Sequence, residues 1–226
     1  HRQSSAASDV YKRQIMYRLI SLLGKIELKK LFEAKNLSDS DFNEIENSLS
    51  LLSRSKFFID DTSSLSPSEI LSRSRKLKRE NPDLGLIIID YMQLMKADTK
   101  NDNRVSEMSE ISRSLKALAK EIDVPVIALS QLNRAPETRT AKRPVLADLK
   151  DSGAIEQDAD IVTFVFRAEK YEQDLENKGL AIIDLAKHRN GPTGEVKLHF
   201  SDKYTKFQDL APDDPALKNP DFSTED

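Results

Sequence analysis

A run of branched apolar residues over 86–89 ends abruptly at Asp90. Such a run is typical of a strand that is buried on both faces of a parallel sheet. Ligands of α/β folds bind at the carboxyl ends of parallel strands. An aspartate at that place can therefore hold a Mg²⁺ ion that bridges nucleotide phosphates. The same residue could instead cap the turn that follows an ordinary strand.

The next segments complete a strand–helix–strand unit. Apolar residues recur at helical spacing over 104–122, which predicts an amphipathic helix. A second apolar strand is predicted over 126–130, and Gln131 follows it. The crossover of such a βαβ unit is right-handed, so Asp90 and Gln131 are expected near each other at one edge of the sheet. A neutral amide beside a metal carboxylate can sense a γ-phosphate or orient an attacking water.

Further elements are predicted on both sides of this unit. Ser66 is a predicted helix N-cap, because Pro67 follows it and Glu69 completes a capping box. Other apolar patterns predict a helix from Ile15, a polar helical segment over 38–53, and strands at 57–60, 161–166, 180–186 and 196–200. The sequence Asn190-Gly191-Pro192 separates the last two strands, so a β-hairpin is predicted there.

Both ends of the chain differ from this middle part. Residues 1–14 have no apolar periodicity and do not fit a signal peptide. They are interpreted either as foreign sequence joined to a truncated gene or as a natural disordered leader. From residue 208 the chain is acidic and rich in proline, which predicts a disordered tail over 208–226. The folded domain is therefore expected over 15–207.

Composition restricts the class of protein. The 226 residues suffice for one domain with a sizeable core, and the net charge of −3 excludes a global basic surface. Contacts to nucleic acid would have to come from local loops. The chain has no cysteine, which excludes disulfides and thiolate metal sites and fits a reducing cytoplasm. Three scattered histidines do not predict a metal cluster, and no apolar run approaches the length of a membrane span.

The sequence contains no phosphate-binding loop of the form G-x-x-x-x-G-K-[ST]. The backbone N–H groups and the lysine of such a loop hold the nucleotide phosphates. The pair Gly24-Lys25 has no glycine upstream, and Ile26 stands where serine or threonine is required. We therefore reject this pair as a phosphate loop. The chain by itself is expected to hydrolyse ATP barely or not at all.

Four motifs occur in the order IIIDYMQLM, ALSQLNR, DLKDSGAIEQDADIV and KHRNGPTG. Together they resemble the C-terminal ATPase domain of replicative DNA helicases of the DnaB family, over about residues 15–207. The resemblance implies an α/β fold with a RecA-like P-loop NTPase core, a mostly parallel twisted sheet flanked by helices, and a C-terminal β-hairpin. In this family the P-loop strand and the catalytic glutamate precede the segment that starts here at Ile15. The resemblance therefore implies a domain truncated at its N-terminal side.

The same resemblance implies a function and a set of partners. The parent enzyme would be an ATP-dependent DNA helicase that uses ATP and Mg²⁺ to translocate on single-stranded DNA during replication. It would assemble as a homohexamer ring around that strand in the cytoplasm. A primase and a helicase loader would be its partners.

The resemblance also assigns roles to four residues of the nucleotide site. Asp90 resembles the Walker B aspartate, which holds Mg²⁺ directly or through water, and Gln131 resembles the γ-phosphate sensor. Lys187 and Arg189 alternate along a strand and so share one face near the hairpin tip. By resemblance they reach the ATP of the neighbouring subunit as companion lysine and arginine finger, where arginine stabilises charge on the transferred phosphoryl group. Without the resemblance they would be a solvated surface pair, and His188 on the other face is expected to be structural.

Two loops resemble the DNA-binding loops of the family. Arg134 lies in a polar and basic stretch over 133–143, which by resemblance faces the central channel and contacts DNA phosphates. Asp151 and Gly153 resemble a second channel loop, in which glycine permits close approach of the backbone to the strand. The family more often has Arg-Glu where this chain has Lys150-Asp151. Because neither loop contains an aromatic platform, DNA binding is expected to be directed at the backbone and tolerant of sequence.

Two other interpretations remain open from the sequence. Another RecA-like ATPase, of recombination or repair, would share the fold and the aspartate at the strand end. The close succession of DLKDSGAIEQDAD and KHRNGPTG favours the helicase over that alternative. A degenerate module that has lost nucleotide chemistry and only assembles or binds a partner would also lack a P-loop.

Overall fold

The computed structural model describes residues 6–99, 103–132, 143–171 and 178–211. The chain divides into two compact units. Unit 1 comprises residues 1–62, 167–183 and 196–226, and unit 2 comprises residues 63–166 and 184–195.

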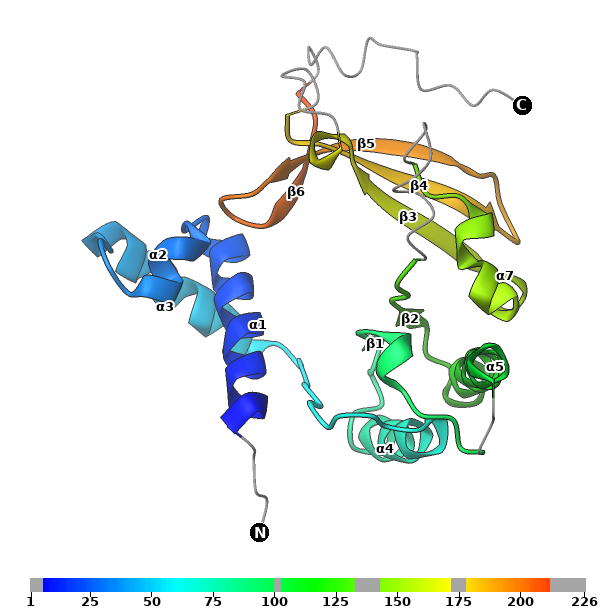
Figure 1. Cartoon of the computed structure of the whole chain (residues 1–226). Helices are drawn as coiled ribbons and strands as arrows, with labels where there is room; N and C mark the ends of the chain where they lie inside the picture. The colour runs from blue at the N-terminus through cyan, green and yellow to red at the C-terminus, as the bar shows by residue number, and fades with distance from the viewer. Residues whose placement is uncertain (1–5, 100–102, 133–142, 172–177, 212–226) are drawn as a thin grey trace. The chain divides into compact units, whose positions relative to one another are not determined.

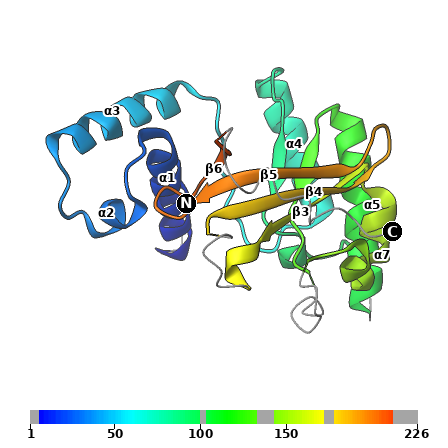
Figure 2. The ribbon, with the colours of Figure 1, turned by 90° about the horizontal axis from the view of Figure 1, so that it is seen from above.

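Unit 1 begins with three helices, which Figure 1 and Figure 2 show in blue: α1 (Ala6–Gly24), α2 (Leu28–Glu33) and α3 (Asp39–Arg54). They enclose an apolar cluster of Ile20, Ile26 and Leu31. A Cβ atom added to Gly24 would lie 3.1 Å from the hydroxyl oxygen of Ser48, so α1 and α3 approach each other closely at this glycine. Gly24 therefore serves helix packing, which agrees with its rejection as part of a phosphate loop.

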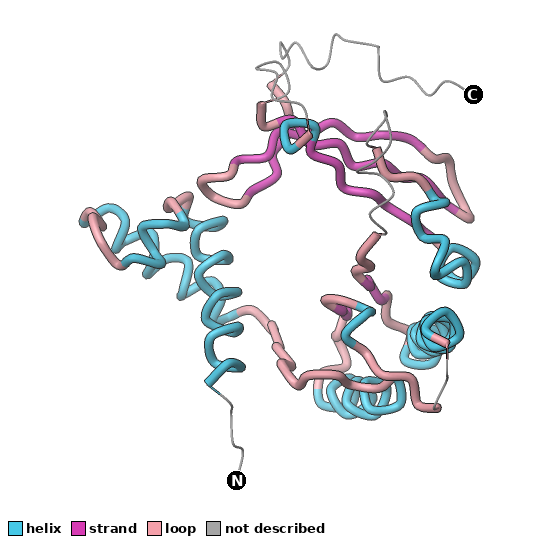
Figure 3. The backbone as a smooth tube through the Cα atoms, in the orientation of Figure 1, coloured by secondary structure: helices cyan, strands magenta, loops and turns pink. Residues whose placement is uncertain are grey.

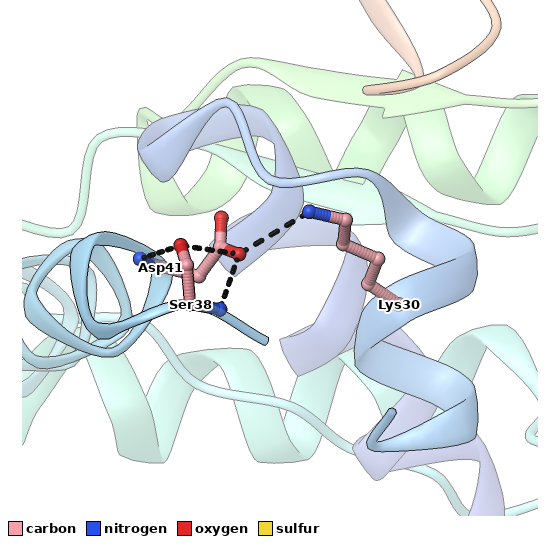
Figure 4. Close-up of polar contacts among 3 residues, drawn as sticks. All are labelled: Lys30, Ser38 and Asp41. Atoms are coloured by element: carbon pink, nitrogen blue, oxygen red, sulfur yellow. Dashed lines mark hydrogen bonds and ion pairs between the residues drawn. The ribbon is translucent and has the colours of Figure 1, made fainter. Parts of the chain in front are cut away.

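The start of α3 is fixed by a reciprocal cap (Figure 4). The Ser38 hydroxyl accepts the Asp41 backbone N–H at 3.1 Å, and Asp41 Oδ2 accepts the Ser38 N–H at 2.9 Å. Lys30 of α2 pairs with the same carboxylate oxygen at 3.3 Å. The backbone N–H and hydroxyl of Ser38, together with Lys30, lower the pKa of Asp41. The ionised carboxylate thus links α2 to the first turn of α3.

The later part of unit 1 contains an antiparallel strand pair. The strand β5 (Gly194–Ser201) pairs with β6 (Lys206–Asp209), and the facing rings of Phe200 and Phe207 have centroids 4.8 Å apart. The guanidinium of Arg167 lies 4.0 Å from the centroid of the Phe200 ring. This strand pair therefore carries its own aromatic and cationic contacts.

Unit 2 contains the predicted strand–helix–strand unit. The strands β1 (Ile87–Ile89) and β2 (Val126–Ala128) pair in parallel, with Ile88 opposite Ile127, and the helix α5 (Arg104–Ile122) connects them. Figure 3 shows the two short strands beside their connecting helix. The predicted helix is confirmed at both ends, and the strands are shorter than predicted.

The helix α4 (Pro67–Glu80) precedes β1 and confirms the predicted capping box. The Glu69 carboxylate accepts the Ser66 backbone N–H at 2.8 Å, and the Ser66 hydroxyl accepts the Glu69 N–H at 3.4 Å. The helix ends before Asn81, because a residue that precedes a proline, here Pro82, disfavours helical backbone.

The two faces of the parallel strand pair differ in burial. On the inner face, Ile87 and Val126 pack against a buried cluster of Leu118, Ile122 and Val124. A second cluster includes Met92, Met95, Met108, Ile111, Leu115 and Ile155. On the outer face, Ile88 and Ile127 are 59% and 52% exposed. The expectation of a strand buried on both faces is therefore wrong for this structure.

The second sheet has four strands in the order β3-β4-β5-β6. Its first two strands are β3 (Ile161–Arg167) and β4 (Leu180–His188), and the unit boundaries fall within β3, β4 and β5. The strands β4 and β5 are neighbours, which confirms the predicted hairpin. Within the described ranges the parallel sheet has only the strands β1 and β2, so the expected mostly parallel sheet is not found there. The chain is a mixed α/β fold with a small parallel and a larger, C-terminal antiparallel sheet.

Short 3-10 and helical segments join these elements: η1 (Met92–Leu94), η2 (Leu146–Ser152), α7 (Gly153–Asp158) and η3 (Ala168–Lys170).

The strand predicted at 57–60 is wrong, because those residues form irregular chain. Among the described helices, none combines the length and apolar composition that a membrane span requires.

Regular structure extends beyond the limits expected for the folded part. The helix α1 begins at Ala6, so residues 6–14 are helical. At the other end, β6 extends to Asp209, so residues 208 and 209 belong to a strand and not to the tail. Sequence periodicity missed this strand, because a four-residue strand is defined by its partner strand.

Candidate functional site

The ends of β1 and β2 carry the two predicted nucleotide residues. Asp90 is exposed and follows directly on β1, and Gln131 lies three residues beyond β2. Backbone hydrogen bonds continue past the ladder, because the Leu129 N–H donates to Ile89 O at 2.9 Å and the Met92 N–H donates to Leu129 O at 2.9 Å. The two segments that carry Asp90 and Gln131 thus leave the sheet side by side.

Gln93 holds these two segments together. Its amide nitrogen donates to the Ser130 hydroxyl at 3.0 Å and to the Gln131 carbonyl at 3.2 Å, and its amide oxygen accepts the Gln131 N–H at 3.2 Å. The Arg104 guanidinium also donates to the Gln93 carbonyl at 2.6 Å. Sequence reasoning missed Gln93, although it lies three residues after Asp90 in the same motif. Its partner is 38 residues away, so only the fold reveals the contact.

The residues at this edge fit a magnesium site in which the phosphates of a bound nucleotide supply the remaining ligands. No group of three or more acidic or histidine side chains that could hold a metal ion occurs in the described residues. Magnesium needs no such group, because one or two carboxylates with waters and substrate phosphates usually hold it. An exposed carboxylate at the carboxyl end of a parallel strand meets that requirement.

Lys187 and Arg189 lie at the end of β4 and share one anchor. The Lys187 ammonium donates to the Glu156 carbonyl, and the Arg189 guanidinium donates to the Gln157 carbonyl. These carbonyls belong to the last turn of α7, where helix carbonyls lack partners within the helix and attract cations. The predicted alternation is confirmed, because His188 turns elsewhere and its ring lies 3.3 Å from Pro192 O.

Asp160 joins this group and was missed by sequence reasoning. One carboxylate oxygen of Asp160 pairs with Lys116 of α5, and the other lies 3.8 Å from an Arg189 guanidinium nitrogen. The hydrogen bond from Lys116, with the charges of Lys116 and Arg189, lowers the pKa of Asp160. Asp160 is therefore an ionised carboxylate between two cations. It lies in the motif segment EQDAD, but its partners come from two other elements.

The loop residue Arg134 lies outside the described residues, so its predicted place stays a prediction. The far end of the same loop is described. The Arg143 guanidinium forms a two-point ion pair with Glu195 of β5, with one N–O distance of 3.4 Å, and lies 5.9 Å from the centroid of the Phe166 ring. The polar and basic stretch over 133–143 ends at Arg143, and this ion pair anchors that end of the stretch to β5.

A second carboxylate lies near this anchor. Burial raises the pKa of Asp184 on β4, and the negative charge of Glu195 raises it further, whereas Arg143 opposes the shift.

The second predicted DNA loop is the turn from η2 into α7. Asp151 lies in η2, and its side chain lies outside the described part. Gly153 begins α7, is exposed, and has no atom within 4 Å of the position where a Cβ would stand. Nothing within the described residues therefore requires glycine at this position.

Comparison with known proteins identifies the family. The sequence model of one protein family, the DnaB-like helicase C-terminal domain, matches residues 5–209 of this chain. The replicative DNA helicase DnaB of Haemophilus influenzae is 48% identical over 199 residues, which are 88% of this chain and 42% of that protein. The DnaB of Pasteurella multocida is 49% identical over 199 residues, which are 88% and 43% of the two chains. The DnaB of Geobacillus stearothermophilus is 46% identical over 203 residues, which are 89% and 44%.

Two solved structures share the fold. One is an ATPase domain with a TM-score of 0.85 at 40% identity, and the match covers 88% of this chain and 71% of that chain. The other is a structure of a DnaB-like replicative helicase and its interactions with primase, with a TM-score of 0.85 at 40% identity. This match covers 88% of this chain and 49% of that chain. The chain spans 42% to 44% of the length of the three DnaB relatives. By its sequence and its fold, the chain belongs to the family of DnaB-like helicase C-terminal domains.

Proposed function

We propose that this chain is the motor segment of a replicative DNA helicase, in which ATP hydrolysis drives translocation on single-stranded DNA and separation of the duplex. The observation that carries the proposal is the edge of β1 and β2 in a chain of this family. There Asp90 and Gln131 follow paired parallel strands, and Gln93 ties the two segments together. The proposal includes a RecA-like P-loop core for the complete protein.

In this proposal the polar residues at the sheet edge act on the nucleotide. Asp90 would hold Mg²⁺, directly or through water, and the ion supplies positive charge to the phosphates when bound. Gln131 would orient a water or contact the γ-phosphate without adding charge. The two hydrogen bonds between Gln93 and the Gln131 backbone support this role, because they limit the movement of the sensor relative to Asp90.

Lys187 and Arg189 would act on the ATP of a neighbouring subunit in a homohexamer ring. A guanidinium placed there stabilises charge on the transferred phosphoryl group, and a closed ring gives every site such a neighbour. The exposure of Arg189 at the end of β4 supports this role, because a group that serves another subunit must be accessible.

The DNA contacts would come from Arg134, Asp151 and Gly153. The open space beside Gly153 supports an approach of the DNA strand at this turn. A primase and a helicase loader are the protein partners that we propose. One of the similar structures describes a DnaB-like helicase and its interactions with primase.

A hybrid protein tests the proposed function. In this hybrid helicase, residues 5–209 of the chain replace the matching segment of the Haemophilus influenzae relative. We expect DNA-stimulated ATP hydrolysis and duplex unwinding, and we expect Asp90→Ala to abolish both, because Mg²⁺ loses the carboxylate that holds it directly or through water. Glu80→Ala, which removes an exposed carboxylate of α4, is the control and should change neither rate. A folded hybrid that assembles but never hydrolyses ATP would favour the degenerate module.

Arg134 is predicted to contact a DNA phosphate. Arg134→Ala in the hybrid helicase should weaken binding of single strands by a similar factor for all sequences. The slope of log binding constant against log salt should fall by roughly 0.7 for each phosphate that the protein no longer neutralises. Fluorescence anisotropy of labelled oligonucleotides over a salt series measures this slope, with Lys76→Ala on α4 as the control. An unchanged slope together with loss of basal ATP hydrolysis would place Arg134 at the nucleotide instead.

A further inference from the structure

The segment from Gln157 to Asp160 contacts Arg189 at three points. The backbone N–H of Arg189 donates to Asp160 O at 2.9 Å, and its guanidinium donates to Gln157 O. The other guanidinium nitrogen lies 3.8 Å from Asp160 Oδ1. A planar guanidinium with two of its nitrogens engaged has a defined direction, because its donors form a rigid fork.

These contacts orient Arg189 more than they stabilise the fold. The side chains of Arg189 and Asp160 are 46% and 53% exposed. Ion pairs at such exposure contribute little to the free energy of unfolding. The contacts do remove rotational freedom from a long side chain before it meets its target.

Lys116 connects Asp160 to the core of unit 2. Lys116 pairs with Asp160 Oδ2 and follows Leu115, which is buried in the cluster that also contains Ile111 and Ile155. That cluster joins α5 to α7. The carboxylate beside Arg189 is therefore attached to a packed helix and not to a free loop.

We propose that Asp160 is a positioning residue for Arg189, and that Lys116 fixes Asp160 against α5. The inference rests on the proposed role of Arg189 at a neighbouring nucleotide. A guanidinium stabilises the negative charge that develops on a phosphoryl group more effectively when the protein has already oriented it toward that group. The helix α5 connects the strands that precede Asp90 and Gln131. The same helix therefore borders the nucleotide edge of its own subunit and the cation offered to the next one.

The first test uses the 226-residue chain itself. In a ¹⁵N-arginine sample, Asp160→Asn should lower the order parameter of the Arg189 Nε–H group, and Lys116→Met should lower it by a smaller amount. Glu80→Gln is the matched control, because Glu80 forms a comparable exposed pair with Lys76 on α4. An order parameter that stays the same in Asp160→Asn overturns the proposal. Because the pair is exposed, thermal unfolding should remain close to that of the control.

The second test measures ATP hydrolysis by the hybrid helicase. Asp160→Asn should lower kcat roughly ten- to hundredfold, because the Arg189 guanidinium loses its fixed orientation toward the transferred phosphoryl group. The KM for ATP should stay within about twofold of the value for the unmodified hybrid. Asp160→Glu, which keeps the charge, should recover part of kcat and also serves if the asparagine variant folds poorly. In an Arg189→Lys background, Asp160→Asn should cost little further, because Asp160 acts through the guanidinium.

The outcomes separate this inference from the proposed function. If Arg189→Ala abolishes hydrolysis but Asp160→Asn leaves kcat unchanged, Arg189 keeps its role and Asp160 does not position it. An equal loss from Asp160→Asn with and without Arg189→Lys would likewise overturn the inference, because Asp160 would then act independently. If Arg189→Ala leaves hydrolysis unchanged, the proposed function of Arg189 itself fails.

Discussion

Arg189→Ala in the hybrid helicase is expected to lower kcat for ATP hydrolysis by about a thousandfold or more, the magnitude typical of an arginine finger. The ring should remain assembled, since the contacts of this guanidinium are partly exposed and lie within its own subunit. Steady-state phosphate release at saturating ATP and Mg²⁺ gives kcat, and light scattering gives the mass of the assembly. Lys76→Ala, which removes an exposed cation of α4, is the matched control and should retain the full rate.

Mixing experiments show whether Arg189 acts on its own subunit or on a neighbour. When mutant and unmodified subunits share one ring, each defective arginine should silence a site that belongs to the next subunit. Inactive subunits can also block coordinated turnover, so activity should fall more steeply than the mutant fraction rises. A strictly proportional decline would contradict coordinated turnover and would indicate that the subunits work independently.

Ile111→Ala is expected to cause the largest loss of stability. Ile111 is 0% exposed and lies in the cluster that joins η1, α5 and α7. Truncation of such a buried side chain leaves a cavity and costs about 3–4 kcal/mol of the free energy of unfolding. A domain stability of about 5–15 kcal/mol makes that loss large. Urea unfolding of the 226-residue chain, followed by circular dichroism, measures it.

A surface position of the same helix provides the control for this measurement. Val105 lies in the first turn of α5 and is 42% exposed, so Val105→Ala should cost below about 1 kcal/mol. Equal destabilisation by the two variants would contradict the burial of Ile111 in the core beneath α5. Loss of the α5 core should also loosen Lys116, because Lys116 directly follows Leu115 of that cluster.

Local signals of the sequence were sufficient for several elements. The helical spacing over 104–122 predicted α5 with its observed bounds, and the Ser-Pro-Ser-Glu start predicted the cap of α4. The alternation at the end of β4 placed Lys187 and Arg189 on one face. These features depend on residues a few positions apart, so a single segment contains the information.

Other predictions failed because they depend on partners in space. The apolar run of β1 indicated burial on both faces, but burial is decided by what covers a strand, and Ile88 is exposed. The segment 57–60 has the composition of a strand but is irregular, whereas the four residues of β6 gain a partner strand from β5. A backbone ladder requires two segments, and only one of them is visible in a local pattern.

The sequence by itself determined the family resemblance, the βαβ unit and the identity of the residues proposed to carry chemistry. The tertiary structure decided how those residues are held. Gln93 reaches Gln131 across 38 positions, and Arg143 reaches Glu195 across 52 positions. Lys116 meets Asp160 across 44 positions. Contacts at such separations exist only in the folded chain, because a charge or an amide in the sequence does not specify its distant partner.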